Sequence, residues 1–191
     1  ETMGFIKKLF GRHESQSALP ALGEDDWGTL LSAAGNVGGD LFDLMHAHHT
    51  NESDSSVASL EAGFVGVAAA SYFYVVQYAP HLDISETAQS LFDRYRRFFV
   101  EKNTTDLKLE SADALAFDKL LRREGSPAVE MYTRAFFISY RDPAEALDSV
   151  IDVLKLRLSD SGAIAISAQT EADLRRKLRS ACGALGPAYG V

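Results

Sequence analysis

The sequence predicts an all-α protein, a single-domain bundle of about six to eight helices with a buried central helix near residues 57–79. Apolar residues recur three and four positions apart through most of the chain, the spacing of one helix face. Serine, threonine or aspartate precedes several of these stretches, where helix N-caps are favoured. Strand-like alternation occurs at residues 154–158 and 163–167, which could form a hairpin; because the helical stripe continues through Leu158, we expect a helix, a loop and one short extended segment near 163–167.

The expected organisation has three parts: a basic amphipathic segment at residues 3–12, a connector at 13–23 and one helical domain at 24–185. A chain of 191 residues suits one domain with a real core. Its apolar fraction of 46% and charged fraction of 24% are globular averages. The single cysteine, Cys182, leaves no pair for a disulfide or a cysteine-based metal site, which favours a cytoplasmic protein.

The segment at 3–12 has the pattern of a short helix with one apolar face. Four large apolar residues share that face: Phe5, Ile6, Leu9 and Phe10. Lys7, Lys8 and Arg12 lie largely on the rest of the surface. We expect this segment to pack on its own domain or in the groove of a protein partner, with peripheral contact to an anionic membrane as the alternative.

The domain begins with an acidic run at residues 24–26, which suits a helix N-terminus. Helical spacing continues from Trp27 to Met45 but is interrupted by Gly35, Gly38 and Gly39. These glycines either break the segment into two helices or let another helix approach closely, and the sequence leaves both alternatives open.

Residues 57–79 are the most apolar part of the chain and are nearly long enough to cross a membrane. No lysine or arginine flanks them to set an orientation, and their tyrosines are spread along the run instead of gathering at its ends. We therefore predict a central helix buried by its neighbours. Gly63 and Gly66 would allow close helix contacts there.

The second half of the chain is predicted to form a series of amphipathic helices. Their expected first residues or N-caps are Ser85, Ser111, Ser126, Asp142 and Thr170. One of these helices is expected to end at Glu124–Gly125, and the next to begin at Ser126 with Pro127 in its first turn.

Charges are sorted along the chain. Residues 13–93 contain no lysine or arginine, yet they hold twelve acidic residues and all five histidines. From Arg94 onward, sixteen basic residues stand against fourteen acidic ones. Such asymmetry predicts two faces that pair with each other or with a partner.

The function predicted from these features is that of a non-enzymatic cytoplasmic binding, adaptor or inhibitor-type module without a cofactor. The net charge of −8 argues against nucleic-acid binding, because phosphate contacts require clustered cations. We expect a protein partner with a basic patch, docked by electrostatic attraction and apolar anchors. The predicted partner-binding residues are Phe5, Ile6, Leu9, Phe10, Asp40, Asp43, Glu52 and Asp54.

Two further functions stay open. Asp43, His46 and His49 step by three along a predicted helix, a spacing that can place imidazole and carboxylate ligands on one metal ion. That pattern indicates a metal-dependent helical enzyme. The other alternative is a peripheral membrane protein anchored by residues 3–12, and association into a homodimer is compatible with any of the three.

Overall fold

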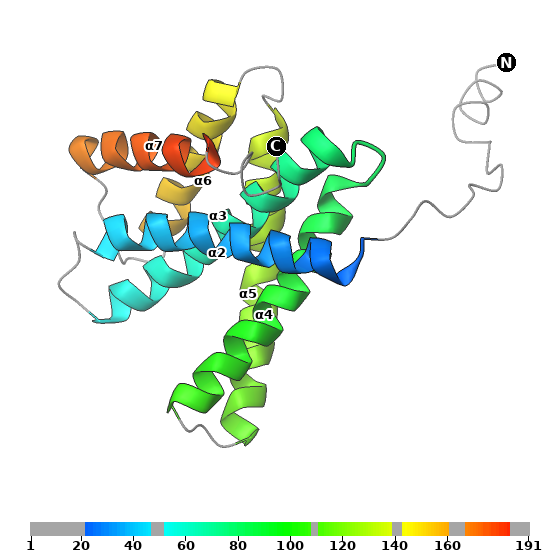
Figure 1. The fold of residues 1–191 in the computed structure, drawn as a ribbon. Coiled ribbons are helices and arrows are strands. Elements are labelled where there is room, and N and C mark those ends of the chain that lie inside the picture. The colour runs from blue at the N-terminus through cyan, green and yellow to red at the C-terminus, as the bar shows by residue number, and fades with distance from the viewer. Residues whose placement is uncertain (1–21, 47–51, 108–110, 139–142, 161–166, 184–191) are drawn as a thin grey trace, which may run out of the picture.

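The computed structural model describes residues 22–46, 52–107, 111–138, 143–160 and 167–183, which form an all-α bundle without strands in those ranges (Figure 1). The six helices are α2 (Glu24–His46), α3 (Glu52–Tyr78), α4 (Ile84–Leu107), α5 (Ser111–Ile138), α6 (Pro143–Asp160) and α7 (Ala168–Gly183). The predicted fold class is therefore confirmed. The predicted N-terminal segment at 3–12, most of the connector at 13–23 and residues 163–166 of the expected extended segment lie outside the described residues.

The prediction of a buried central helix is also confirmed, because α3 is covered by α2, α4, α5 and α6. Every residue from Glu61 to Tyr72 is buried. The stretch Ser56–Tyr78 is long and apolar enough to cross a membrane by length and composition alone. However, 72% of its most apolar part is buried inside the protein, as expected for the core helix of a bundle.

Glycines in α2 and α3 allow these two helices to cross at close range. Helix α2 is unbroken from Glu24 to His46, so the second of the two alternatives for its glycines is correct. A Cβ atom on Gly66 would lie 2.2 Å from the carbonyl oxygen of Ala34, and one on Gly38 would lie 3.1 Å from that of Ala62. Only glycine fits at Gly66 without a backbone shift, because the obstacle is main chain.

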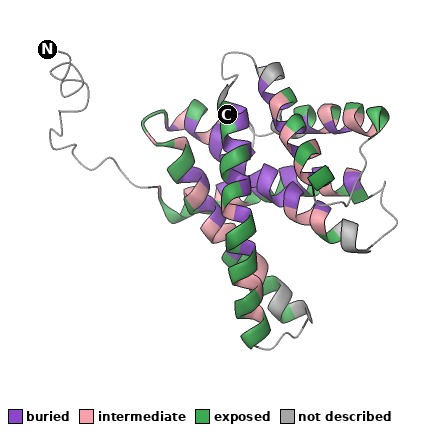
Figure 2. Ribbon diagram, turned by 180° about the vertical axis from the view of Figure 1, so that it is seen from behind, coloured by how far each residue is buried: buried purple, intermediate pink, exposed green. Residues whose placement is uncertain are grey.

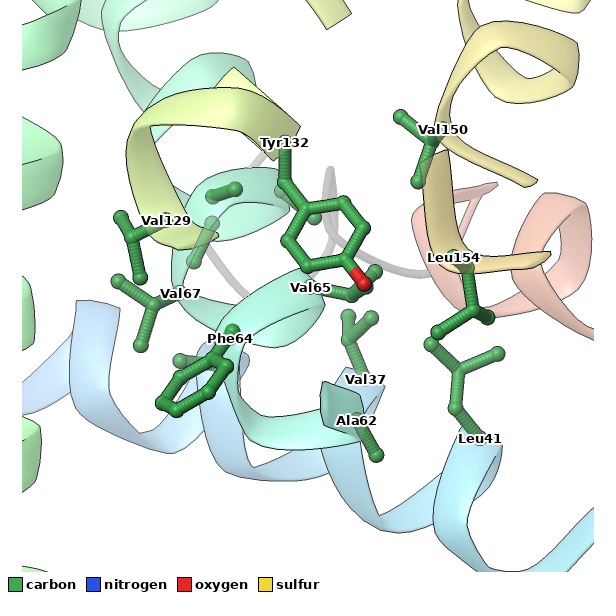
Figure 3. Close-up of a cluster of buried hydrophobic side chains, with 14 of the residues drawn as sticks. Val37, Leu41, Ala62, Phe64, Val65, Val67, Val129, Tyr132, Val150 and Leu154 are labelled. Carbon is green, nitrogen blue, oxygen red and sulfur yellow. The ribbon is translucent and has the colours of Figure 1, made fainter. Parts of the chain in front are cut away.

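The core centres on Tyr132 of α5, whose ring lies between α3 and α6 (Figure 3). Val65 of α3 lies on one side of this ring, and Val150 of α6 lies on the other. Below it, Leu154 of α6 faces Leu41 of α2, and both leucines are fully buried. Helix α7 closes the bundle by packing on α2 and α6.

Helices α4 and α5 run side by side and extend beyond the rest of the bundle (Figure 1). We call their projecting part, residues 97–107 and 111–120, the outer hairpin. Figure 2 shows that its described surface is largely exposed. Three large apolar side chains there are between 46% and 60% exposed: Phe98, Leu115 and Leu120. The ring of Phe99 in α4 contacts that of Phe117 in α5 at a centroid distance of 6.1 Å and joins the two helices; it also stacks on Tyr95, one turn earlier in α4, at 5.8 Å.

The predicted helix boundary at Gly125–Ser126 is wrong, since α5 continues through both residues and contains Pro127 in its interior. Buried positions before and after the boundary form one helical stripe: Leu121, Gly125, Ala128, Val129 and Tyr132. An interior proline costs about 3 kcal/mol, an amount comparable to the burial of one or two large apolar side chains. The free energy gained by burying this continuous stripe therefore outweighs the local preference for a helix end at Gly125.

Two predicted helix starts are displaced by a few residues. Asp83 caps α4, because its Oδ1 atom accepts a hydrogen bond of 2.8 Å from the amide of Glu86, and Ser85 lies inside the helix. Ser167 caps α7 by accepting a bond of 3.1 Å from the amide of Thr170, the residue that the sequence had suggested as the cap. In both cases an equally good capping residue stands two or three positions upstream.

Candidate functional site

An open groove lies where the turn between α3 and α4 meets the end of α5. It has a volume of about 600 Å³. Its apolar lining comes from α3, the turn, the start of α4 and α5: Val75, Val76, Pro80, Leu82, Ile84 and Phe137. Val76 is 49% exposed and Phe137 is 56% exposed, so this face of the protein presents an aliphatic and an aromatic side chain to an incoming molecule.

The groove continues along α5 toward Ser126 as a more polar depression of about 420 Å³. Ser85 and Thr133 line both parts, which makes them one continuous surface. Gln89 of α4 joins the two helices in the floor: its Nε2 donates to the Ser126 carbonyl at 3.0 Å, and its Oε1 accepts from the Ser126 hydroxyl at 2.6 Å. We call the whole surface, from Phe137 to Ser126, the α3–α5 groove.

Acidic residues dominate the charge along the α3–α5 groove. Among the described residues, Asp83, Glu86 and Glu130 line it together with one cation, Arg134. Arg134 is bound to Glu130 one turn earlier on α5. Asp83 is held in place by its capping bond to the start of α4. The groove therefore combines apolar walls with an excess of two negative charges, which favours a ligand that is apolar on one side and cationic beside it.

A buried polar cluster lies on the other side of the core. Glu61 of α3 is 5% exposed and accepts hydrogen bonds from Tyr132 Oη at 2.6 Å and from Arg157 Nε and Nη2 of α6 at 2.8 and 2.7 Å. Burial is the main cause that raises the pKa of Tyr132 well above its ordinary value, and the nearby Glu61 charge adds to the effect. The hydrogen bond to Glu61 raises the pKa of Arg157.

This cluster has the geometry of a structural ion pair. Both carboxylate oxygens of Glu61 are engaged by Arg157 in a bidentate bond, and Tyr132 has no exposed surface. A depression of about 350 Å³ opens beside it, lined also by Glu124 and Asp160. Arg157 lines that depression while its Nε and Nη2 atoms bind Glu61, so the arrangement links α3, α5 and α6 and holds a charged pair at the edge of the core.

The sequence-predicted metal ligands lie at the end of α2. Asp43 and His46 are both exposed, and the His46 ring stacks on Phe42 at a centroid distance of 5.3 Å. His49 lies outside the described residues. Among the residues that are described, no three histidine, cysteine, aspartate or glutamate side chains gather as a metal site would require. The metal hypothesis therefore stays a prediction that depends on His49.

The predicted acidic partner surface is divided. Asp40 and Asp43 are at the end of α2, while Glu52 and Asp54 are in the first turn of α3, where their side chains lie outside the described part. Asp40 Oδ1 lies 3.4 Å from Lys177 Nζ of α7. A lysine of the same chain thus already pairs with one of the four acidic residues predicted to bind a partner.

Among the described residues, the sorted charges of the sequence meet in three ion pairs that join different helices. Glu24 of α2 binds Arg94 of α4 through two bonds of 3.0 Å, and Arg94 also lies 4.8 Å from the centre of the Trp27 ring. Asp40 with Lys177 and Glu61 with Arg157 are the other two pairs. At these positions the acidic first half of the chain pairs with the basic second half, as one of the two interpretations of the charge pattern expected.

Sequence reasoning missed both the α3–α5 groove and the buried cluster. The groove combines segments from α3, α4 and α5 that no periodicity relates to one another. The cluster did leave a signal, because Glu61 is a charged residue within the stretch at 57–79 that is predicted to be buried, and a buried carboxylate requires a partner.

Comparison of the chain with protein-family models, with curated proteins and with solved structures finds no match. The geometry described above therefore carries the functional argument.

Proposed function

We propose that this protein is a non-enzymatic binding module that docks a basic amphipathic helix of a protein partner in the α3–α5 groove. The observation that supports the proposal best is the exposure of Val76 and Phe137 on the wall of a groove of about 600 Å³ with an acidic rim. Helix-binding grooves usually combine a concave apolar surface with large aromatic side chains that a partner can cover.

The chemistry of the partner follows from the two parts of the groove. Its apolar part, from Val75 to Phe137, suits the side chains that recur every three or four residues on one face of a helix. Its polar part carries Glu86 and Glu130, which suit lysine or arginine on the flank of the same helix. Because these charges lie at the rim, we expect them to affect the association rate and the salt dependence more than the final affinity.

The acidic end of the α2–α3 pair supports a basic partner less directly. Asp43 is exposed there, but Asp40 is already paired with Lys177. We therefore place the primary contact in the α3–α5 groove and treat Asp43, Glu52 and Asp54 as an additional surface for a partner's basic patch.

The test is a selection of helical peptides on the purified protein. A displayed library of 15-residue amphipathic helices with varied charge would be enriched on the wild-type chain, and the affinity of selected peptides measured by calorimetry. We expect basic amphipathic sequences to be selected, and Phe137→Glu to weaken their binding by at least tenfold, since one desolvated aromatic anchor contributes about 1.4 kcal/mol or more.

The matched control is Leu115→Glu on the outer hairpin. Leu115 is 55% exposed and Phe137 is 56% exposed, so both variants place a carboxylate on a similarly exposed apolar position. Peptide binding should survive Leu115→Glu. Selected peptides that bind Phe137→Glu as tightly as the wild type would place the interaction elsewhere and contradict the proposal.

A further inference from the structure

We infer that residues 3–12 of this chain are themselves an occupant of the α3–α5 groove, which a protein partner must displace. This inference rests on the proposed function, because it concerns the same groove. Three properties of the chain support it: the size of the segment, its charge and the position of the point to which it is tethered.

The segment and the groove agree in length. From Ser126 to Phe137, the lining of the groove follows twelve residues of α5, whose eleven steps of 1.5 Å give a rise of about 16 Å. A helix formed by residues 3–12 would be about 15 Å long. Its apolar face, with Phe5 at one end and Phe10 near the other, offers two aromatic anchors to the walls around Val76 and Phe137.

The charges of the segment and the groove are opposite. Lys7, Lys8 and Arg12 give residues 3–12 three positive charges and no negative one. Among its described residues, the groove carries Asp83, Glu86 and Glu130 against one cation, Arg134. The groove residues Asp83 and Glu86 belong to the stretch from residue 13 to residue 93, which contains no lysine or arginine. The basic residues opposite in charge to them come from the segment directly before that stretch.

The tether begins close to the groove. Helix α2 starts at Glu24, which is fixed to Arg94 of α4, and Arg94 lies ten residues or about 15 Å along the helix from Ile84 at the groove. Asp26 also hydrogen-bonds Tyr74, the neighbour of the groove residue Val75.

The connector is long enough for this span. Eleven chain steps from Arg12 to Gly23 reach at most about 40 Å when fully extended. A linker that matches its span holds the segment near the groove at an effective concentration on the order of 1 mM.

Intramolecular occupancy predicts competition with the same segment added from outside. The probe is a fluorescein-labelled synthetic peptide of residues 3–12, and its binding is followed by fluorescence anisotropy. It is titrated with the full wild-type chain and with a full-length Phe5→Ser/Leu9→Ser variant, whose own segment lacks two apolar anchors. For a peptide affinity on the order of 0.1 mM, the variant should bind the peptide about tenfold more tightly than the wild type.

Two further full-length variants locate the binding site. Phe137→Glu, added to the Phe5→Ser/Leu9→Ser background, should abolish peptide binding, whereas Leu115→Glu in the same background should leave it unchanged. Circular dichroism checks that all variants keep the helical fold. Equal peptide affinity in wild type and the double variant, with Phe137→Glu still effective, would overturn this inference and leave the groove as a helix-binding site.

Other outcomes are equally informative. Failure of the peptide to bind the double variant would overturn the inference, while the proposed function would still be decided by the library selection. Cosedimentation with vesicles of phosphatidylserine and phosphatidylcholine separates the membrane alternative: we expect no binding. Sedimentation of the wild type that is lost in Phe5→Ser/Leu9→Ser would assign residues 3–12 to a membrane surface and overturn the inference.

Discussion

The α2–α3 crossing and the outer hairpin are both pairs of neighbouring helices, yet they are held together by opposite means. At the crossing, Gly38 and Gly66 bring the backbones themselves into contact, and the small residues around them are fully buried. In the outer hairpin, the rings of Phe99 and Phe117 meet between the helices, and three other large apolar side chains remain substantially exposed: Phe98, Leu115 and Leu120.

The difference indicates where the stability of the protein resides. Close packing excludes solvent from residues 61–72 of α3, and an atom added at Gly38 or Gly66 would meet main chain. The outer hairpin buries little apolar surface per residue, and its side chains can adapt to a change. The α2–α3 crossing and the core around it should therefore carry most of the free energy of unfolding, and four experiments test that expectation.

The largest effect is expected from Arg157→Ala, which removes the partner of Glu61 on the central helix. The carboxylate would stay buried with only the Tyr132 hydroxyl to bind it. We expect the free energy of unfolding to fall by about 3 kcal/mol, measured by urea denaturation, because breaking a buried pair leaves one charge unsolvated.

Two controls define the cause. In Arg157→Met/Glu61→Gln the buried charge is gone and Tyr132 keeps an acceptor, so most of the loss should be recovered. Arg123→Ala removes a pair with Glu124 whose arginine side chain is 73% exposed, and should cost less than about 0.5 kcal/mol. Equal losses in Arg157→Ala and Arg123→Ala would contradict a structural role for the buried cluster.

The second effect tests the backbone contact itself. Gly66→Ala adds a methyl group 2.2 Å from the Ala34 carbonyl oxygen, and we expect a loss of about 2 kcal/mol in the free energy of unfolding. Gly39→Ala is the matched control, since a Cβ there meets nothing within 4 Å, and it should stabilise the helix by about 0.5–1 kcal/mol. Thermal denaturation should show melting temperatures that move in opposite directions. A Gly66→Ala protein as stable as the wild type would show that the crossing adapts.

The fold class and the buried α3 could be predicted because both depend on local periodicity and composition. The stripe of α2 and the apolar run of α3 are readable without knowing what they contact. The role of Gly38 was open at that level, because a helix break and a close approach have the same residue pattern. Only the position of α3 relative to α2 decides between them.

The candidate site could not be predicted either, because it also depends on how separate helices lie relative to one another. Val76 and Phe137 are 61 positions apart, and neither belongs to a motif. Pro127 shows the opposite case. The residues around it predict a helix start, but α5 continues through it because residues on both sides are buried. The local sequence indicates where a helix can begin or end, but burial in the folded protein determines which of these boundaries form.

The third effect concerns Tyr95, which joins α4 to α3 by placing its hydroxyl oxygen against Gly63. Burial raises the pKa of Tyr95 to about 12, above the ordinary value near 10. Between pH 10 and 12 the folded protein keeps a proton that the unfolded chain loses. The free energy of unfolding should therefore decrease as the pH rises, by up to about 1.4 kcal/mol per pH unit from this group.

Urea denaturation at intervals from pH 9 to 11.5 measures that slope. Tyr95→Phe should reduce the slope without abolishing it, because the pKa of Tyr132 is raised as well. Below pH 9 the free energy of unfolding should depend on pH in the same way in the wild type and in Tyr95→Phe. A slope in Tyr95→Phe as steep as that of the wild type would place the alkaline sensitivity elsewhere in the core.

The smallest effect is expected at the outer hairpin, where Leu115→Ser removes an apolar side chain that is 55% exposed. Little buried surface is lost, so the free energy of unfolding should change by less than about 0.5 kcal/mol. Leu41→Ala, at a fully buried position on α2, should cost about 2–5 kcal/mol by the same urea assay. A loss at Leu115 that approaches the loss at Leu41 would mean that the hairpin surface is covered in solution. Concentration-dependent sedimentation of the wild type, absent in Leu115→Ser, would then identify a second copy of the chain as the cover.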